Sequence, residues 1–122
     1  MNAPTYNDPA EGHAVFRPAG VFKLAEMVER VAGAISYARE SGVRRLLVVL
    51  TAVSGIQPPK LTPRYRFVRD WARAAEGKVR VAVVISERMM DPGRFGVTVA
   101  MNAGMDANVF VDEKAALEWL LA

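Results

Sequence analysis

Two uninterrupted apolar runs constrain this sequence most strongly. They are Leu46–Leu50 and Val81–Ile85, and neither contains a polar residue. A strand with one face in water alternates apolar and polar side chains, whereas a parallel strand covered on both faces is apolar throughout. A segment with helical periodicity lies between the two runs. The sequence therefore predicts two buried parallel strands joined by a helix, with a right-handed crossover.

Four helices are expected around these strands, each from apolar positions three and four residues apart. The first spans 24–41, ends at Gly42 and buries Leu24, Met27, Val28, Val31, Ile35 and Ala38. The second begins at Thr62-Pro63 as N-cap and first turn, and buries Tyr65, Val68, Trp71, Ala72 and Ala75. The third spans 93–103. The fourth follows the cap Asp112 over 113–121 and buries Ala116, Leu117, Leu120 and Leu121.

A hairpin is expected at the start of the chain and a short strand near its end. The hairpin strands are 4–7 and 13–17, with the alternation placing Ala14 and Phe16 on one face and His13 exposed or at a rim. The last strand is Val109–Val111. The element order is thus β-β-α-β-α-β-α-β-α. This order predicts one α/β domain over residues 1–122, with a small mixed sheet of about five strands and about four helices.

Residue usage argues against several kinds of site. The 122 residues include no cysteine and one histidine, so disulfides and thiolate metal sites are excluded. No nucleophile and base form a recognisable pair, and no acidic residues have metal-ligand spacing. We therefore expect neither an enzyme nor a cofactor. No apolar stretch reaches the ~18–20 residues of a membrane span, and a cytoplasmic location is expected.

The formal charge of +3 is unevenly distributed along the chain. Residues 60–80 hold seven basic and two acidic side chains, whereas residues 81–122 hold three basic and six acidic ones. Such a dipolar charge distribution favours an oriented contact with another protein at least as much as binding to nucleic acid.

Several segments resemble the STAS superfamily, and more closely its SpoIIAA-like (STAS/SEC14-type) bacterial proteins. The strand and loop Leu46–Thr51 is similar to the family's hydrophobic strand and Ser/Thr loop, and Val81–Ile85 to another of its strands. Val109–Leu120 is similar to its closing strand and Ala-Leu-x-Trp-Leu helix. The resemblance implies a STAS-type fold and a regulator that acts by binding, as the family's anti-sigma-factor antagonists do.

The family's phosphorylation turn has no full counterpart here. The STAS pattern places an Asp in the strand before the loop, where this chain has Val49. Phosphorylated members carry an Asp-Ser-Ser-Gly-like turn, whereas this chain has Ser54-Gly55 followed by Ile56 and two prolines. The resemblance therefore carries no expectation of a phosphoswitch.

The most promising site is the loop over 51–62 with the helix that follows it. At the end of a central strand, such a loop is a usual place for a ligand or partner; the alternative is a proline-stiffened connector. Arg66, Arg69 and Arg73 lie on one helix face and fit carboxylate groups; the alternative is a solvated surface. We expect an acidic protein partner, met by Thr51, Ser54, Thr62, Arg66, Arg69 and Arg73. Val53 and Ile56 would become buried on contact.

The sequence bears on two other kinds of partner. A small apolar ligand or lipid is the alternative, in a pocket near Met89, Phe95 and Met101, and the SEC14 part of the family name suggests it by analogy. Nucleic acid is not expected, because the aromatic residues Tyr65 and Trp71 fall on the buried face of their helix. Nothing in the sequence specifies the oligomeric state.

Overall fold

The two apolar runs form the centre of a five-stranded sheet in a computed structural model of the chain. The structure describes residues 5–6, 12–56, 61–89 and 104–122, with 5–6 and 61–67 as backbone only. The strands lie in the order β1 (Thr5–Tyr6), β2 (Ala14–Phe16), β4 (Arg45–Val49), β6 (Arg80–Val84) and β7 (Ala107–Phe110). All neighbouring pairs are parallel except β1 with β2.

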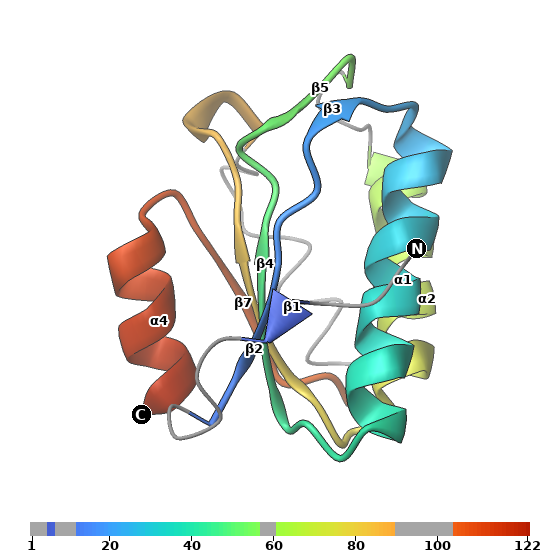
Figure 1. The fold of residues 1–122 in the computed structure, drawn as a ribbon. Helices are drawn as coiled ribbons and strands as arrows, with labels where there is room; N and C mark the ends of the chain where they lie inside the picture. The colour runs from blue at the N-terminus through green and yellow to red at the C-terminus, as the bar shows by residue number, and fades with distance from the viewer. Residues whose placement is uncertain (1–4, 7–11, 57–60, 90–103) are drawn as a thin grey trace.

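Helices cover both faces of this sheet, as the apolar runs predict. The helices α1 (Leu24–Glu40) and α2 (Leu61–Ala75) lie on one face, and α4 (Glu113–Leu121) lies on the other (Figure 1). Alternate residues of β4 and β6 join two separate cores. Leu46, Val48, Val81 and Val83 join the core under α1 and α2, and Leu47, Val49, Ala82 and Val84 join the core under α4. The α/β class and the buried βαβ unit are confirmed.

The order of the strands explains why α1 and α2 share a face. The four parallel strands follow one another in the sequence without reversal. Each crossover therefore moves in the same direction across the sheet, and crossovers of one hand place their helices on the same side. The expected third helix, at 93–103, lies outside the described residues. The described part contains the helices α1, α2 and α4 and one 3₁₀ turn, η2 (Glu87–Met89).

The helix ends follow the sequence except at α2. Glu26 accepts a hydrogen bond from the backbone N–H of Lys23 at 3.0 Å, which is one of the two hydrogen bonds of a capping box at the start of α1. Asp112 caps α4 by accepting from the N–H groups of the second and third helical residues. Helix α2 begins at Leu61, one residue before the predicted N-cap Thr62, whose side chain lies outside the described part of the structure.

The antiparallel pairing of the terminal hairpin is confirmed, but the burial predicted for one residue beside it and for one residue of α4 is wrong. Strands β1 and β2 pair antiparallel, and Ala14 and Phe16 share one core. His13, however, is only 3% exposed, so its predicted rim position is wrong. Leu121 was predicted to face inward and is instead 36% exposed. Alternation along a strand gives the face of a residue, but other elements decide how far that face is covered.

A second sheet, which the sequence does not predict, lies beyond the end of the main one. It consists of β3 (Gly20–Val21) and β5 (Val53–Ser54), which pair in parallel.

Of the helices described, none combines the length and the hydrophobicity that crossing a membrane requires.

Candidate contact surface

The ends of the parallel strands gather several loops at one edge of the sheet. We call this the carboxyl edge, and Figure 1 shows it at the top, with β3 and β5 above it. It comprises the segments that follow β2, β4, β6 and β7, at 17–23, 50–56, 85–89 and 111–113. Helices α1 and α4 begin there as well. The loop singled out in the sequence is therefore part of a larger surface.

The loop after β4 contains the short strand β5, which hydrogen bonds hold against β3. Gly20 N–H donates to the Ala52 carbonyl at 3.1 Å, and Phe22 N–H donates to the Ser54 carbonyl at 3.0 Å. The Ser54 hydroxyl also lies 3.3 Å from the Gly20 carbonyl oxygen, at hydrogen-bond distance. We call the four residues of β3 and β5 the platform. These bonds give it a defined backbone, unlike a simple connector.

Gly55 and Ile56 attach the platform to the rest of the domain. Gly55 has φ +85°, and a Cβ there would lie 2.8 Å from Val21 Cγ1, so the close approach of the two strands requires glycine. Ile56 is 6% exposed and packs in the core under α1 and α2. Its carbonyl accepts a hydrogen bond from Arg88 of η2 at 3.3 Å. The prediction that Ile56 is free to be buried against a partner is wrong.

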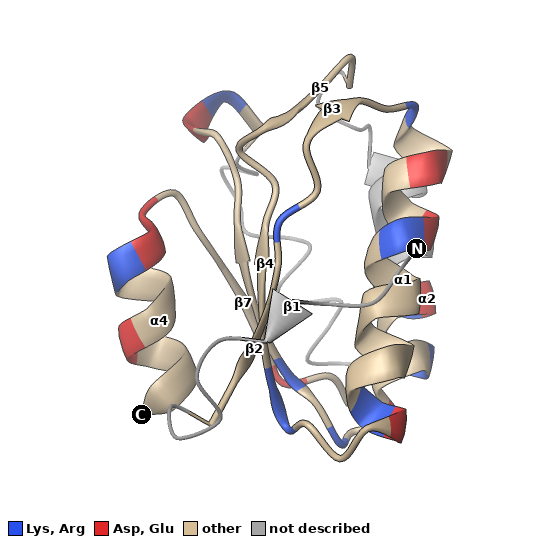
Figure 2. Ribbon diagram, in the orientation of Figure 1, with Lys and Arg blue, Asp and Glu red and all other residues tan. Residues whose placement is uncertain are grey.

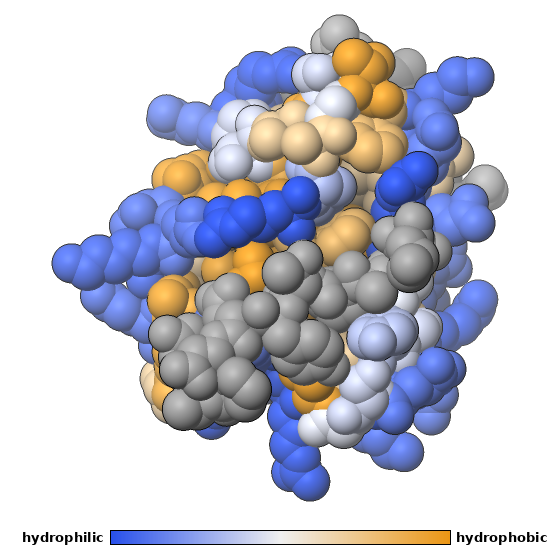
Figure 3. Space-filling view, in the orientation of Figure 1, coloured by the Kyte–Doolittle hydropathy of each residue, from blue (hydrophilic) through white to orange (hydrophobic). Residues whose placement is uncertain are grey.

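An apolar side chain projects from the platform into solvent. Val21 is 81% exposed, the highest exposure among the large hydrophobic residues described. Ala19, Gly20 and Ala52 beside it are also exposed. Figure 3 shows this end of the molecule as a tan and orange area with hydrophilic residues around it. Val21 is thus an exposed branched apolar side chain on an ordered backbone, with small exposed residues around it.

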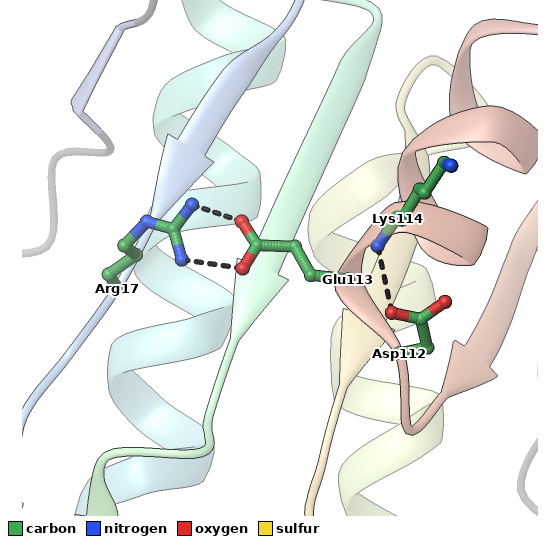
Figure 4. A network of polar contacts seen from close by, with 4 residues as sticks. All are labelled: Arg17, Asp112, Glu113 and Lys114. Atoms are coloured by element: carbon green, nitrogen blue, oxygen red, sulfur yellow. Dashed lines mark hydrogen bonds and ion pairs between the residues drawn. The ribbon is translucent and has the colours of Figure 1, made fainter.

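A paired arginine and glutamate also lie at the carboxyl edge. Arg17, just after β2, donates two hydrogen bonds to the carboxylate of Glu113 in the first turn of α4, one of them at 3.1 Å (Figure 4). These bonds lower the pKa of Glu113 and raise that of Arg17. The pair joins segments 96 residues apart in the sequence. It fixes the start of α4 against the end of β2.

The residues predicted to meet a partner are not all brought together. Thr51 and Ser54 are exposed at the carboxyl edge. Arg73 lies in the last turn of α2, about 18 Å along the helix axis from its start at 1.5 Å per residue, and pairs with Asp70 at 3.6 Å. Arg69 is exposed between these ends. The predicted surface is therefore divided between two ends of the molecule.

Thr62 and Arg66 are described only as helical backbone of α2. Of the residues expected to line an apolar pocket, Phe95 and Met101 lie outside the described residues, and Met89 is half-buried against the core. The apolar-ligand alternative therefore stays a prediction.

The sequence did not predict the exposure of Val21 or the Arg17–Glu113 pair. Two-residue strands have no periodicity, and contacts between distant segments leave no local pattern.

The described parallel strands contain no reversal of strand order, the place at which α/β sheets often hold a catalytic site. Such a reversal opens a crevice, whereas the parallel strands described here follow one another in sequence order. Within the same residues, no three His, Asp or Glu side chains gather as metal ligands.

Comparisons with protein-family models, with curated proteins and with solved structures found no match for this chain.

Proposed function

We propose that this chain is a non-enzymatic, STAS-like binding domain that acts by contacting another protein through its carboxyl edge. The contact would centre on the platform, with Thr51 and Ser54 beside Val21. Partner recognition of this kind agrees with the resemblance of Leu46–Thr51 and Val109–Leu120 to STAS segments. It does not require a nucleophile, a metal or a cofactor.

The observation that carries this proposal is the exposure of Val21. Burying a valine side chain on contact contributes roughly 1.5–3 kcal/mol. Because the platform is already ordered by backbone hydrogen bonds, little conformational entropy remains to be lost when a partner binds. In a mobile loop with the same side chain, the entropy cost of ordering the loop would offset part of the binding free energy gained by burying the valine.

Electrostatics would orient the partner before contact. The predicted role of Arg66, Arg69 and Arg73 is recognition of an acidic surface, and charges outside an apolar contact act mainly on the rate of association. Arg73 lies at the far end of α2 from Thr51, so it would steer an approaching partner and not touch residues bound at the platform.

Affinity capture with a matched pair of variants tests this proposal. Val21→Asp places a charge at the platform, and Leu121→Asp makes the same change at an exposed apolar position at the far end of α4. Both positions are exposed, so both variants should fold. A partner captured by the unmodified chain should be lost with Val21→Asp and kept with Leu121→Asp. Retention by both variants, or loss by both, would refute the platform as the contact surface.

A further inference from the structure

The opposite edge of the sheet carries a concentration of positive charge. Figure 2 shows Lys and Arg gathering at the lower end of the strands, where β4 and β6 begin. Arg45 and Arg80 are direct neighbours in the register of these strands, and Arg80 N–H donates to the Arg44 carbonyl at 2.7 Å. Lys78 lies two residues before Arg80. Four basic residues thus lie at the start of two adjacent central strands.

Three described acidic residues at this edge lie within ion-pair distance of other arginines. Arg39 pairs with Glu76 at 2.9 Å and with Glu40 at 3.4 Å. Arg80 lies 3.7 Å from Asp106. By contrast, the side chains of Arg44, Arg45 and Lys78 make no hydrogen bond or ion pair with the residues described here. We call these three side chains the basic edge.

The described helix ends do not account for the basic edge. Basic side chains stabilise the negative ends of helices, but that effect falls off within the last turn. Arg39 and Arg73 occupy the last turns of α1 and α2, whereas the basic edge lies beyond the helices, on and before the strands. Like charges on neighbouring strands are destabilising. Positions that break a local rule without a compensating contact within the domain are expected at functional surfaces.

We propose that the basic edge is a second interaction surface, which binds an acidic segment of a partner protein. Two of the three side chains are arginines, whose planar guanidinium groups pair with carboxylates through two hydrogen bonds. Arg44 and Lys78 are exposed, and Arg45 is half-buried, so the charged groups are available with little rearrangement. Three cations match a short run of Glu or Asp side chains. Nucleic-acid binding commonly uses a wider set of phosphate contacts.

This surface is separate from the platform. Strands β4 and β6 begin at the basic edge and end at the carboxyl edge, so the whole sheet lies between the two surfaces. The domain could therefore hold two protein segments at once, one by an apolar contact and one by charge. The second proposal does not depend on the first, because neither surface contributes a residue to the other.

Fluorescence anisotropy with a labelled hexaglutamate peptide tests the basic edge. The unmodified chain should bind the peptide at 50 mM NaCl and bind it less tightly at 300 mM NaCl, because salt screens exposed charges. Arg44→Glu with Lys78→Glu should weaken binding at least tenfold. The matched control is Lys23→Glu with Lys114→Glu, which makes the same change in net charge at the carboxyl edge and should alter binding less than twofold. Thermal melts of both variants check that they fold.

Three outcomes would overturn the proposal. They are equal weakening by the two double variants, no weakening by Arg44→Glu with Lys78→Glu, and no binding by the unmodified chain at 50 mM NaCl. A labelled six-nucleotide thymidine strand is the comparison probe, and tighter binding of that strand than of the peptide would exclude an acidic protein segment as the preferred partner. If the charge-reversed variant unfolds, Arg44→Gln with Lys78→Gln replaces it and should weaken peptide binding at least threefold.

Discussion

Replacing Arg80 by methionine should lower the free energy of unfolding by about 2 kcal/mol. Arg80 fixes the end of α4 to the start of β6. Its guanidinium lies 3.9 Å from the centre of the Trp119 ring, and its Nη2 donates to the Trp119 carbonyl at 2.8 Å. Methionine keeps an apolar chain over the indole, so the change removes mainly the charge and the hydrogen bond.

The magnitude follows from the separate contacts. A half-buried cation over tryptophan contributes about 1 kcal/mol, and a hydrogen bond from a charged donor contributes about 1.5–3 kcal/mol. The ion pair with Asp106 adds almost nothing, because Asp106 is 61% exposed and 3.7 Å away. Two effects oppose this loss. Methionine removes one of two like charges that are neighbours in the strand register, Arg80 and Arg45, and it removes the buried Nε, which has no hydrogen-bond partner among the described residues.

Urea denaturation measures this prediction, with Arg44→Met as the matched control. Arg44 is exposed, and its side chain has no partner among the described residues, so its replacement should change the free energy of unfolding by less than about 0.5 kcal/mol. A loss for Arg80→Met below that value, or an equal loss for Arg44→Met, would refute the structural role given to Arg80. The dependence of the free energy on urea concentration should be the same in all three proteins.

Two further predictions concern the carboxyl edge. Gly55→Ala should destabilise the domain by about 1–3 kcal/mol, and by more than Gly42→Ala, because both glycines have positive φ but only at Gly55 would a Cβ meet another side chain, that of Val21. Equal losses in thermal denaturation would contradict this reasoning. Glu113→Gln should cost up to about 1 kcal/mol at pH 7, since it removes the charged pair with Arg17. Folding lowers the pKa of Glu113. The pair therefore stabilises the domain fully at pH values above the pKa of the unfolded carboxyl group, about 4.3. This stabilisation is lost as the pH falls through the lower pKa of the folded state. The difference between Glu113→Gln and the unmodified chain should therefore be larger at pH 7 than at pH 3, and an equal difference at both would be evidence against the pair.

The fold was predictable where local chemistry determines structure. Five-residue apolar runs predict strands buried on both faces, and Leu47 and Val48 of one run indeed join opposite cores. Asp112 is predicted as a cap because it directly precedes a helical pattern, where a side-chain oxygen can accept from the free N–H groups of the first turn. These signals depend on neighbouring residues and need no knowledge of the rest of the fold.

The surface was less predictable, because it depends on contacts between distant segments. Val53 and Ser54 form a strand only because residues 20–21 lie beside them. The inferred exposure of His13 and Ile56 was wrong for the same reason. Each is buried by the three-dimensional arrangement, which single-sequence patterns do not describe.

Site-specific photo-crosslinking from the platform tests the central proposal most directly. The photoreactive residue p-benzoylphenylalanine would replace Val21 in one version of the chain and Leu121 in another, both in cells that naturally contain this protein. The proposal predicts an adduct of one defined mass from position 21, containing a second protein, and no such adduct from position 121. The absence of an adduct at position 21, or the same adduct from both positions, would contradict it.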